Sequence, residues 1–176
     1  MVEIVKTDIN DLLLIKPKAF YDKRGYFLET YNREILKSLK VNINFIQDNE
    51  SKSHFSVLRG IHFQKSPYEQ TKLIRVIKGE IQDVAVDLRP SSKTYKKYFS
   101  IILNDKNKYQ LFIPKGFGHA FLTLSKESII SYKVDKLYYK NYDSGIRYND
   151  PIININWKLN KNQIILSAKD NNLPYI

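Results

Sequence analysis

Turn-forming residues divide residues 71–134 into short segments, and this spacing restricts the fold more than any other feature of the chain. Short runs rich in β-branched and aromatic side chains are typical of strands and are too short for ordinary helices. We predict strands over residues 71–78, 81–88, 98–103, 109–113, 119–124 and 128–134. Turns separate them at Gly79-Glu80, at residues 104–107 and at residues 114–118. A chain with so many short strands folds as a β-sandwich or a barrel.

The N-terminal part adds a turn, a strand and a helix. Residues 22–25, Asp-Lys-Arg-Gly, predict a turn, and the aromatic and β-branched side chains within residues 26–31 predict a strand after it. Asn32 is suited to cap a helix over residues 33–40, with Ile35, Leu36 and Leu39 as its buried stripe. The segment from Asn160 onward is helical or irregular. Long helices do not alternate with the strands, so we predict an all-β jelly roll or β-sandwich with short terminal helices.

The composition narrows the kind of protein further. The 176 residues match the length of one domain, and we predict a single domain over residues 1–176. The chain has no cysteine, which excludes disulfides, thiolate metal sites and a cysteine nucleophile. The longest apolar run near the start, residues 12–15, is too short for a signal-peptide core or a membrane span. We therefore expect a cytoplasmic protein with no membrane partner.

The formal net charge of +11 results from 29 Lys and Arg residues against 18 Asp and Glu residues. Proteins that bind nucleic acids gather their basic residues in patches or tails. Here the lysines are dispersed among acidic residues, and neither a zinc-finger spacing nor an RNP motif is present. We predict a lysine-rich solvated surface and no nucleic-acid partner. The same positive field would favour a small substrate that carries phosphate.

Two of the three histidines, His62 and His119, stand in strand-like sequence beside glycine-containing turns. This arrangement resembles the paired motifs of the cupin jelly roll, so the predicted sandwich is of the cupin type. Metal-binding cupins place further ligands near the first histidine, where this chain has Gln64 and Glu69. Two imidazoles, an amide and a carboxylate are a poor ligand set for a transition metal. We predict no metal, and we interpret His54 as a surface residue.

Without a metal, His62 is either a core histidine or an acid-base group. The basic residues Arg59, Lys72 and Arg75 fall on predicted strands, and buried unpaired cations are costly. They either point outward or line a mouth that receives an anion, and periodicity leaves both alternatives open. Asp170 ends a Ser-x-x-Asp pattern that by itself is typical of a helix cap.

A set of motifs covers the chain from about residue 20 to residue 170. They are Phe-Tyr-Asp-Lys-Arg-Gly-Tyr-Phe-Leu-Glu at 20–29, Gln-Asp-Asn at 47–49, Val-Leu-Arg-Gly-Ile-His-Phe-Gln at 57–64, Lys-Leu-Ile-Arg-Val at 72–76, Asp-Val-Ala-Val-Asp-Leu-Arg at 83–89, Ile-Pro-Lys-Gly-Phe-Gly-His-Ala-Phe at 113–121, Tyr-Lys at 132–133, Gly-Ile-Arg-Tyr-Asn-Asp-Pro at 145–151 and Ser-Ala-Lys-Asp at 167–170. In this order and spacing they resemble the dTDP-4-dehydrorhamnose 3,5-epimerases, cupin-like isomerases that act on a thymidine-diphosphate 4-keto-6-deoxy sugar.

Matched position by position, the resemblance implies a catalytic set and a substrate-binding set. In the catalytic set, His62 is the general base, Asp170 pairs with it, Tyr132 is the acid on the opposite face of the sugar, and Lys72 lies near the ketone oxygen. In the binding set, Arg24 and Arg59 match positions at the diphosphate, His119 matches a second active-site histidine, and Phe20, Phe27, Glu29, Gln47, Asn49 and Tyr138 match positions near the nucleotide. The resemblance also implies no metal or cofactor, and a homodimer in which the strand at residues 24–29 enters the neighbouring subunit's site.

The residue types suit this chemistry independently. A hydrogen on C3 or C5 is α to the C4 ketone, and its removal gives an enolate. An imidazole, with an ordinary pKa of about 6.5, is a suitable base at neutral pH, and a phenol, with an ordinary pKa of about 10, stays protonated and donates. Three functions remain open: the 3,5-epimerase, a C3-only epimerase or ketoisomerase on a related dTDP- or GDP-sugar, and a non-catalytic cupin binding protein.

Overall fold

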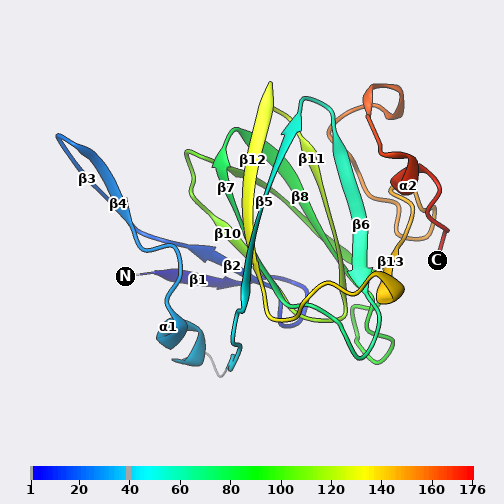
Figure 1. The fold of residues 1–176 in the computed structure, drawn as a ribbon, viewed down its shortest axis with the longest axis horizontal. Coiled ribbons are helices and arrows are strands. Elements are labelled where there is room, and N and C mark those ends of the chain that lie inside the picture. The colour runs from blue at the N-terminus through cyan, green and yellow to red at the C-terminus, as the bar shows by residue number, and fades with distance from the viewer. Residues whose placement is uncertain (1, 39–40) are drawn as a thin grey trace.

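The computed structural model describes residues 2–38 and 41–176, and it contains two antiparallel sheets packed face to face (Figure 1). The six-stranded sheet has the order β1 (Glu3–Lys6), β2 (Leu13–Lys16), β10 (Gln110–Ile113), β7 (Lys72–Lys78), β12 (Glu127–Val134) and β5 (Gln47–His54). The five-stranded sheet has the order β13 (Asp143–Gly145), β6 (Leu58–Gln64), β11 (Phe117–Thr123), β8 (Glu80–Asp87) and β9 (Tyr98–Asn104). The predicted all-β sandwich is confirmed.

Short helices lie toward the two ends of the chain, as predicted. They are α1 (Arg33–Ser38), η1 (Lys140–Tyr142), η2 (Lys161–Gln163) and α2 (Ala168–Asn171). The Oδ1 atom of Asn32 accepts the backbone N–H of Glu34 at 3.0 Å, as a cap does, and Leu36 is buried against a satellite cluster on the outer face of the six-stranded sheet. The last part of the predicted helix, including Leu39, lies outside the described residues. None of the helices in the described ranges is long and apolar enough to cross a membrane.

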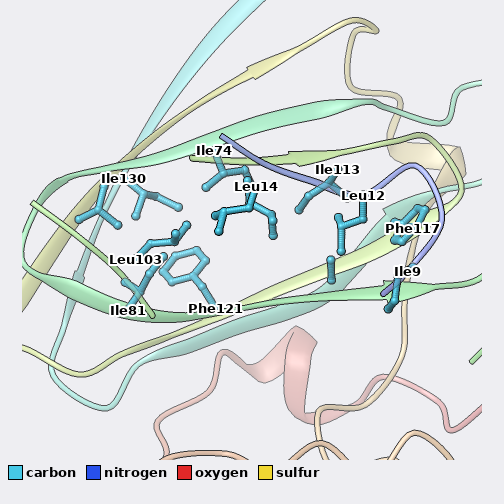
Figure 2. Close-up of a cluster of buried hydrophobic side chains, with 13 residues drawn as sticks. Ile9, Leu12, Leu14, Ile74, Ile81, Leu103, Ile113, Phe117, Phe121 and Ile130 are labelled. Atoms are coloured by element: carbon cyan, nitrogen blue, oxygen red, sulfur yellow. The ribbon is translucent and has the colours of Figure 1, made fainter. Parts of the chain in front are cut away.

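The main hydrophobic core fills the space between the two sheets (Figure 2). The six-stranded sheet contributes Leu14, Ile74, Leu111, Ile113 and Ile130, among others, and the five-stranded sheet contributes Ile81, Ala85, Leu103, Phe117 and Phe121. Burying a side chain of this size removes apolar surface from water and stabilises the fold by about 1.5–3 kcal/mol. Packing of the sheets against each other therefore holds the strands that carry the polar residues described below.

Consecutive strands β7 and β8 belong to different sheets. The predicted turn between them is present at Gly79, whose φ of +82° favours glycine and where a Cβ atom would lie only 2.2 Å from the carbonyl oxygen of Glu127. β7 pairs with β10 and β12, whereas β8 pairs with β11 and β9. The chain thus crosses from one sheet to the other at this turn, and Lys72 and Asp83 come to the interior from opposite sides.

Both faces of β8 are buried, although its sequence alternates. The alternation places Val84 and Val86 on one face and Asp83, Ala85 and Asp87 on the other. Ala85 packs in the main core, while Val84 and Val86 pack in a second cluster with residues 146–155 of the C-terminal segment. This segment covers the outer face of the sheet, whereas Asp83 and Asp87 share the inner face with Ala85 and have no exposed surface. Two buried carboxylates therefore need polar partners inside the protein.

A hairpin of β3 (Ala19–Asp22) and β4 (Gly25–Leu28) extends away from the two sheets (Figure 1). The predicted turn is present, and the predicted strand over residues 26–31 ends early, at Leu28. Four aromatic side chains of this hairpin are more than half exposed: Phe20, Tyr21, Tyr26 and Phe27. Within one copy of the chain, this aromatic surface is largely uncovered.

Candidate active site

A cavity of about 410 Å³ opens at one end of the sandwich, between the two sheets and the segment that leads to α2. The polar residues that line it are Ser51, Arg59, His62, Lys72, His119, Tyr132, Ser167, Lys169 and Asp170. Six of the residues that we singled out in the sequence, namely Arg59, His62, Lys72, His119, Tyr132 and Asp170, thus meet around one space although they are far apart in the chain.

His62 and Asp170 form a tight pair in this cavity. Nε2 of His62 lies 2.5 Å from Oδ1 of Asp170, and Asp170 is only 3% exposed. Burial acts to raise the pKa of Asp170, but the hydrogen bond and charge of His62, together with hydrogen bonds from Ser167 and the backbone of Gly60, outweigh it and lower the pKa. The carboxylate is therefore ionised at neutral pH and holds one nitrogen of the imidazole ring.

Residues 167–170 also cap a helix, as their pattern predicted, but the capping atom is Oγ of Ser167 and not the carboxylate of Asp170. Oγ of Ser167 accepts the backbone N–H of Asp170 at 3.0 Å, so Ser167 is the N-cap of α2. The side-chain carboxylate of Asp170 reaches His62 instead of the helix terminus. The short helix thus supports the residue that contacts the histidine.

Tyr132 and Lys72 enter the cavity from the six-stranded sheet, opposite His62. Tyr132 is half-buried on β12, and burial raises the pKa of its phenol while the charge of Arg59 acts in the opposite sense. On β7, burial lowers the pKa of Lys72 to about 8, against the effect of the negative charges of Asp83 and Asp143. At pH 7 the phenol is protonated and about nine-tenths of the Lys72 amines are charged.

Asp83 is a site residue that the sequence analysis did not single out. Its Oδ1 atom lies 2.6 Å from Nε2 of His119, which is paired across the strands with His62. Its Oδ2 atom is buried and makes no hydrogen bond to any residue that the structure describes. Burial lowers the pKa of His119, whereas Asp83 acts to raise it. The available signal was a carboxylate between apolar residues of a predicted strand, but the pattern did not reveal that it lies beside His119 in the interior.

Arg59 lies at the rim of the cavity, where its guanidinium is anchored by the neighbouring strand. Its Nε donates to Oγ of Ser53, and its Nη2 donates to the carbonyl of Lys52, both at 3.0 Å. Arg59, Lys72 and Lys169 give the lining three cationic groups, against the single carboxylate of Asp170. The field at the mouth therefore favours an anion. Arg75, by contrast, alternates with Ile74 and Val76 of the core and lies on the outer face of β7.

Three predicted nucleotide-binding residues lie outside the cavity lining. Gln47 and Asn49 are on edge strand β5, where the side chain of Gln47 donates to that of Asn49 at 2.7 Å. Tyr138 is 57% exposed, and its hydroxyl donates to Oδ2 of Asp143 at 3.0 Å. The same carboxylate pairs with Lys169, which lines the cavity. Tyr138 is therefore next to the mouth.

The other predicted binding residues belong to the projecting hairpin or follow it, and one chain does not bring them to the cavity. Phe20 and Phe27 are exposed on β3 and β4, and Arg24, in the turn, is bonded to Asp22. Glu29 follows β4 and accepts a hydrogen bond from Asn32. In a single copy, these four residues are separate from His62 and Tyr132.

The two residues at the remaining cupin ligand positions are engaged or lie elsewhere. The Gln64 amide is hydrogen-bonded to three backbone groups, and Glu69 lines a different cavity. Within the described ranges, no three His, Cys, Asp or Glu side chains are arranged to hold a metal ion. The chemistry that this site offers is acid-base catalysis beside a fixed cation.

Known proteins resemble this chain over nearly its whole length. A family model described as dTDP-4-dehydrorhamnose 3,5-epimerase matches residues 6–176. The curated dTDP-4-dehydrorhamnose 3,5-epimerase of Methanothermobacter thermautotrophicus is 48% identical over 169 residues, which are 96% of this chain and 91% of that relative. The chain belongs to this family. This 3,5-epimerase family member is thus an enzyme of the isomerase class, as the sequence motifs predicted.

Solved structures of dTDP-4-dehydrorhamnose 3,5-epimerases share the fold over the whole chain. The Bacillus anthracis enzyme, crystallised with TDP and PPi bound, matches with a TM-score of 0.96 and 44% identity over 100% of both chains. The Legionella pneumophila dTDP-6-deoxy-D-glucose-3,5-epimerase, in complex with dTDP-4-keto-L-rhamnose, matches with a TM-score of 0.95 and 39% identity over 99% of this chain and 93% of that one. The cupin-type fold prediction agrees with these neighbours.

Proposed function

We propose that this epimerase inverts C3 and C5 of a nucleotide-linked 4-keto-6-deoxy sugar, converting dTDP-4-keto-6-deoxy-D-glucose to dTDP-4-keto-L-rhamnose, with His62 as base and Tyr132 as acid. One observation carries the assignment of roles: the imidazole and the phenol line the same cavity but come from opposite sheets, on β6 and β12. Inversion requires that a proton leaves one face of the carbon and another arrives on the opposite face. Two groups on opposite walls meet that requirement.

His62 is suited to remove the proton because Asp170 fixes its ring. With Nε2 bonded to the Asp170 carboxylate, the other ring nitrogen is left with its lone pair to accept a proton from C3 or C5. The imidazolium that forms is then stabilised by the adjacent negative charge, as in catalytic triads. Asp170 is the positioning partner, and it remains ionised throughout.

Lys72 supplies the positive charge that the enolate oxygen needs. Removing a proton next to the C4 ketone places negative charge on the ketone oxygen, and a charge placed there in advance lowers the barrier. Lys72 lines the cavity from the same sheet as Tyr132, and its lowered pKa of about 8 leaves its amine mainly charged at neutral pH. Tyr132 then donates its phenolic proton to the opposite face of the carbon.

The cationic mouth suits the diphosphate of the substrate. Arg59 and Lys169 stand where a nucleotide diphosphate would approach the sugar-binding cavity, and the net charge of +11 adds a long-range attraction for anions. Gln47, Asn49 and Tyr138, near this mouth or on the adjacent edge strand, are proposed to contact the nucleotide.

The function is tested by incubating the protein with dTDP-4-keto-6-deoxyglucose in D2O and locating the deuterium by NMR. Deuterium at both C3 and C5, with formation of the L-rhamno product, is the expected result. Deuterium at C3 alone would identify the C3-only alternative. Lack of incorporation into this substrate and into related dTDP- and GDP-keto-sugars would leave only a binding protein.

We also propose that the active unit is a homodimer in which the β3–β4 hairpin enters the neighbouring subunit's site. The hairpin projects from the two sheets. It carries the exposed aromatic residues Phe20 and Phe27 and the cationic residue Arg24. Exposed aromatic surface of this kind is typical of an interface. Exchange of the hairpin would bring residues to a neighbour's cavity that they do not reach within their own chain.

Mixed dimers test this exchange directly. Arg24→Ala and His62→Ala are each expected to be nearly inactive, and refolding them together should restore about a quarter of the wild-type activity, because half of the dimers are mixed and each has one intact site. Failure of complementation between variants that do form mixed dimers would show that Arg24 serves its own chain.

We propose a cytoplasmic location as well, because the substrate is a nucleotide sugar and no part of the cysteine-free chain requires an oxidising compartment.

A further inference from the structure

Gln64 has every polar atom of its side chain engaged although it lies outside the cavity lining. The residue ends β6, two positions beyond His62, and it is 5% exposed. Its Oε1 accepts the backbone N–H of Tyr139 at 2.6 Å, and its Nε2 donates to the carbonyls of Tyr68 and Leu137 at 2.7 and 3.1 Å. Because an N–H only donates and a carbonyl only accepts, an amide is the group that satisfies all three partners.

Two of these partners, Leu137 and Tyr139, lie directly before and after Tyr138 in the chain. The Gln64 side chain is therefore hydrogen-bonded to the backbone on both sides of Tyr138. The backbone of Gln64 also pairs with Asp143 of β13, and the Asp143 carboxylate accepts the Tyr138 hydroxyl at 3.0 Å. Gln64 is therefore connected to Tyr138 in two ways. Its side chain bonds the backbone of the residues before and after Tyr138, and its backbone pairs with Asp143, which accepts the Tyr138 hydroxyl.

The Tyr138 ring needs such support because it is 57% exposed. A mostly solvated side chain has little packing to hold its orientation, and ordering it at the moment of binding costs conformational entropy. A backbone fixed in advance reduces that cost. We propose that Gln64 is a positioning residue that holds Tyr138 at the mouth of the cavity; this rests on the proposed contact between Tyr138 and the nucleotide.

The test compares Gln64→Met with a matched control, Gln82→Met. Gln82 is 1% exposed and makes three similar bonds, to Oγ of Ser100, the carbonyl of Asn156 and the N–H of Lys158, away from the cavity. Both changes leave buried backbone groups unpaired and should lower Tm to a similar extent. Binding of dTDP by titration calorimetry, together with KM and kcat, separates stability from positioning.

Gln64→Met is expected to raise the Kd for dTDP and the KM by about tenfold, the size of coupling usual for residues in contact, with kcat within about twofold of wild type. Gln82→Met should leave both constants unchanged. In a Tyr138→Ala background, Gln64→Met should add less than about a twofold effect, since the ring that it positions is gone. Equal effects of Gln64→Met with and without Tyr138, or wild-type dTDP affinity in Gln64→Met, would overturn the inference.

A second variant provides the test if Gln64→Met does not fold. Gln64→Glu keeps the shape and the acceptor for Tyr139, and a buried carboxyl that is protonated regains one donor. Its dTDP affinity, relative to wild type at the same pH, should therefore improve as the pH falls from 8 to 6; an unchanged ratio would contradict positioning through the donor. Failure of the proposed function differs from both results, because Tyr138→Ala would then bind dTDP as tightly as wild type.

Discussion

Replacing Asp170 by alanine separates the two parts that residues 167–170 play in the structure. The change removes the carboxylate that lies 2.5 Å from His62 but leaves the backbone N–H of Asp170, which is the group that Ser167 caps. We therefore expect proton abstraction to be slowed while α2 and the fold remain.

The magnitude follows from the contact that is deleted. A hydrogen bond to a charged group contributes about 1.5–3 kcal/mol, and the nearly complete burial of Asp170 places this one toward the upper end. Because the imidazolium forms only as the proton is removed, the contribution enters the barrier and corresponds to a loss of about 10- to 150-fold in kcat.

The assay is the rate of deuterium exchange at C3 and C5 with saturating substrate, with Tm measured on the same samples. Ser167→Ala is the matched control: loss of the N-cap should cost about 1 kcal/mol and lower Tm by about 2–4 °C, with much less effect on exchange. If Asp170→Ala instead exchanged at the normal rate and melted early, its carboxylate would be a structural group and the dyad would be wrong.

Three further predictions follow from individual side chains. Since Lys72 stabilises the enolate only when charged and its pKa lies at about 8, kcat should be retained below that pH and fall as the pH rises through it, and this basic limb of the pH–rate profile should be absent from the residual activity of Lys72→Met. Tyr132→Phe should reduce formation of the epimerised product more than loss of the C3 and C5 protons to solvent; an equal reduction of both, followed by NMR, would count against its role as the opposite-face acid. Asp87 is fully buried and bonded to Arg89, Ser92 and Thr94, so Asp87→Ala should lower the free energy of unfolding in urea by about 3–5 kcal/mol, while a loss below 1 kcal/mol would mean that this network contributes little.

Asp83 shows how much of a site the alternation of side chains along a strand can predict. The alternation along residues 81–88 correctly predicted a strand and grouped Asp83 with Ala85 and Asp87. It did not predict that both faces are buried, because the covering residues 146–155 are remote in the chain and contact this strand only in the folded protein. The partnership of Asp83 with His119 depends on the pairing of β8 with β11, which local sequence does not encode.

Gln64 is a second residue whose contacts could not be predicted from its local sequence. In the sequence it occupies a position where metal-binding cupins have a ligand, and its residue type argued against a metal. Its contacts with Tyr68, Leu137 and Tyr139 appear only when β6 lies beside the segment after β12. The sequence therefore argued against a metal-binding role for this side chain, and the structure shows the backbone groups to which it is hydrogen-bonded.

The sequence alone determined the all-β class, most strand positions, the family and the residue types proposed for an acid-base site, because turn propensity, side-chain alternation and motif order are properties of neighbouring residues. Only the tertiary structure decided that β7 and β8 separate into opposite sheets, and that His62 and Tyr132 consequently face one cavity. Which strands pair, and which faces are covered, depends on burying apolar surface contributed by distant segments, and that free energy belongs to the assembled sandwich as a whole.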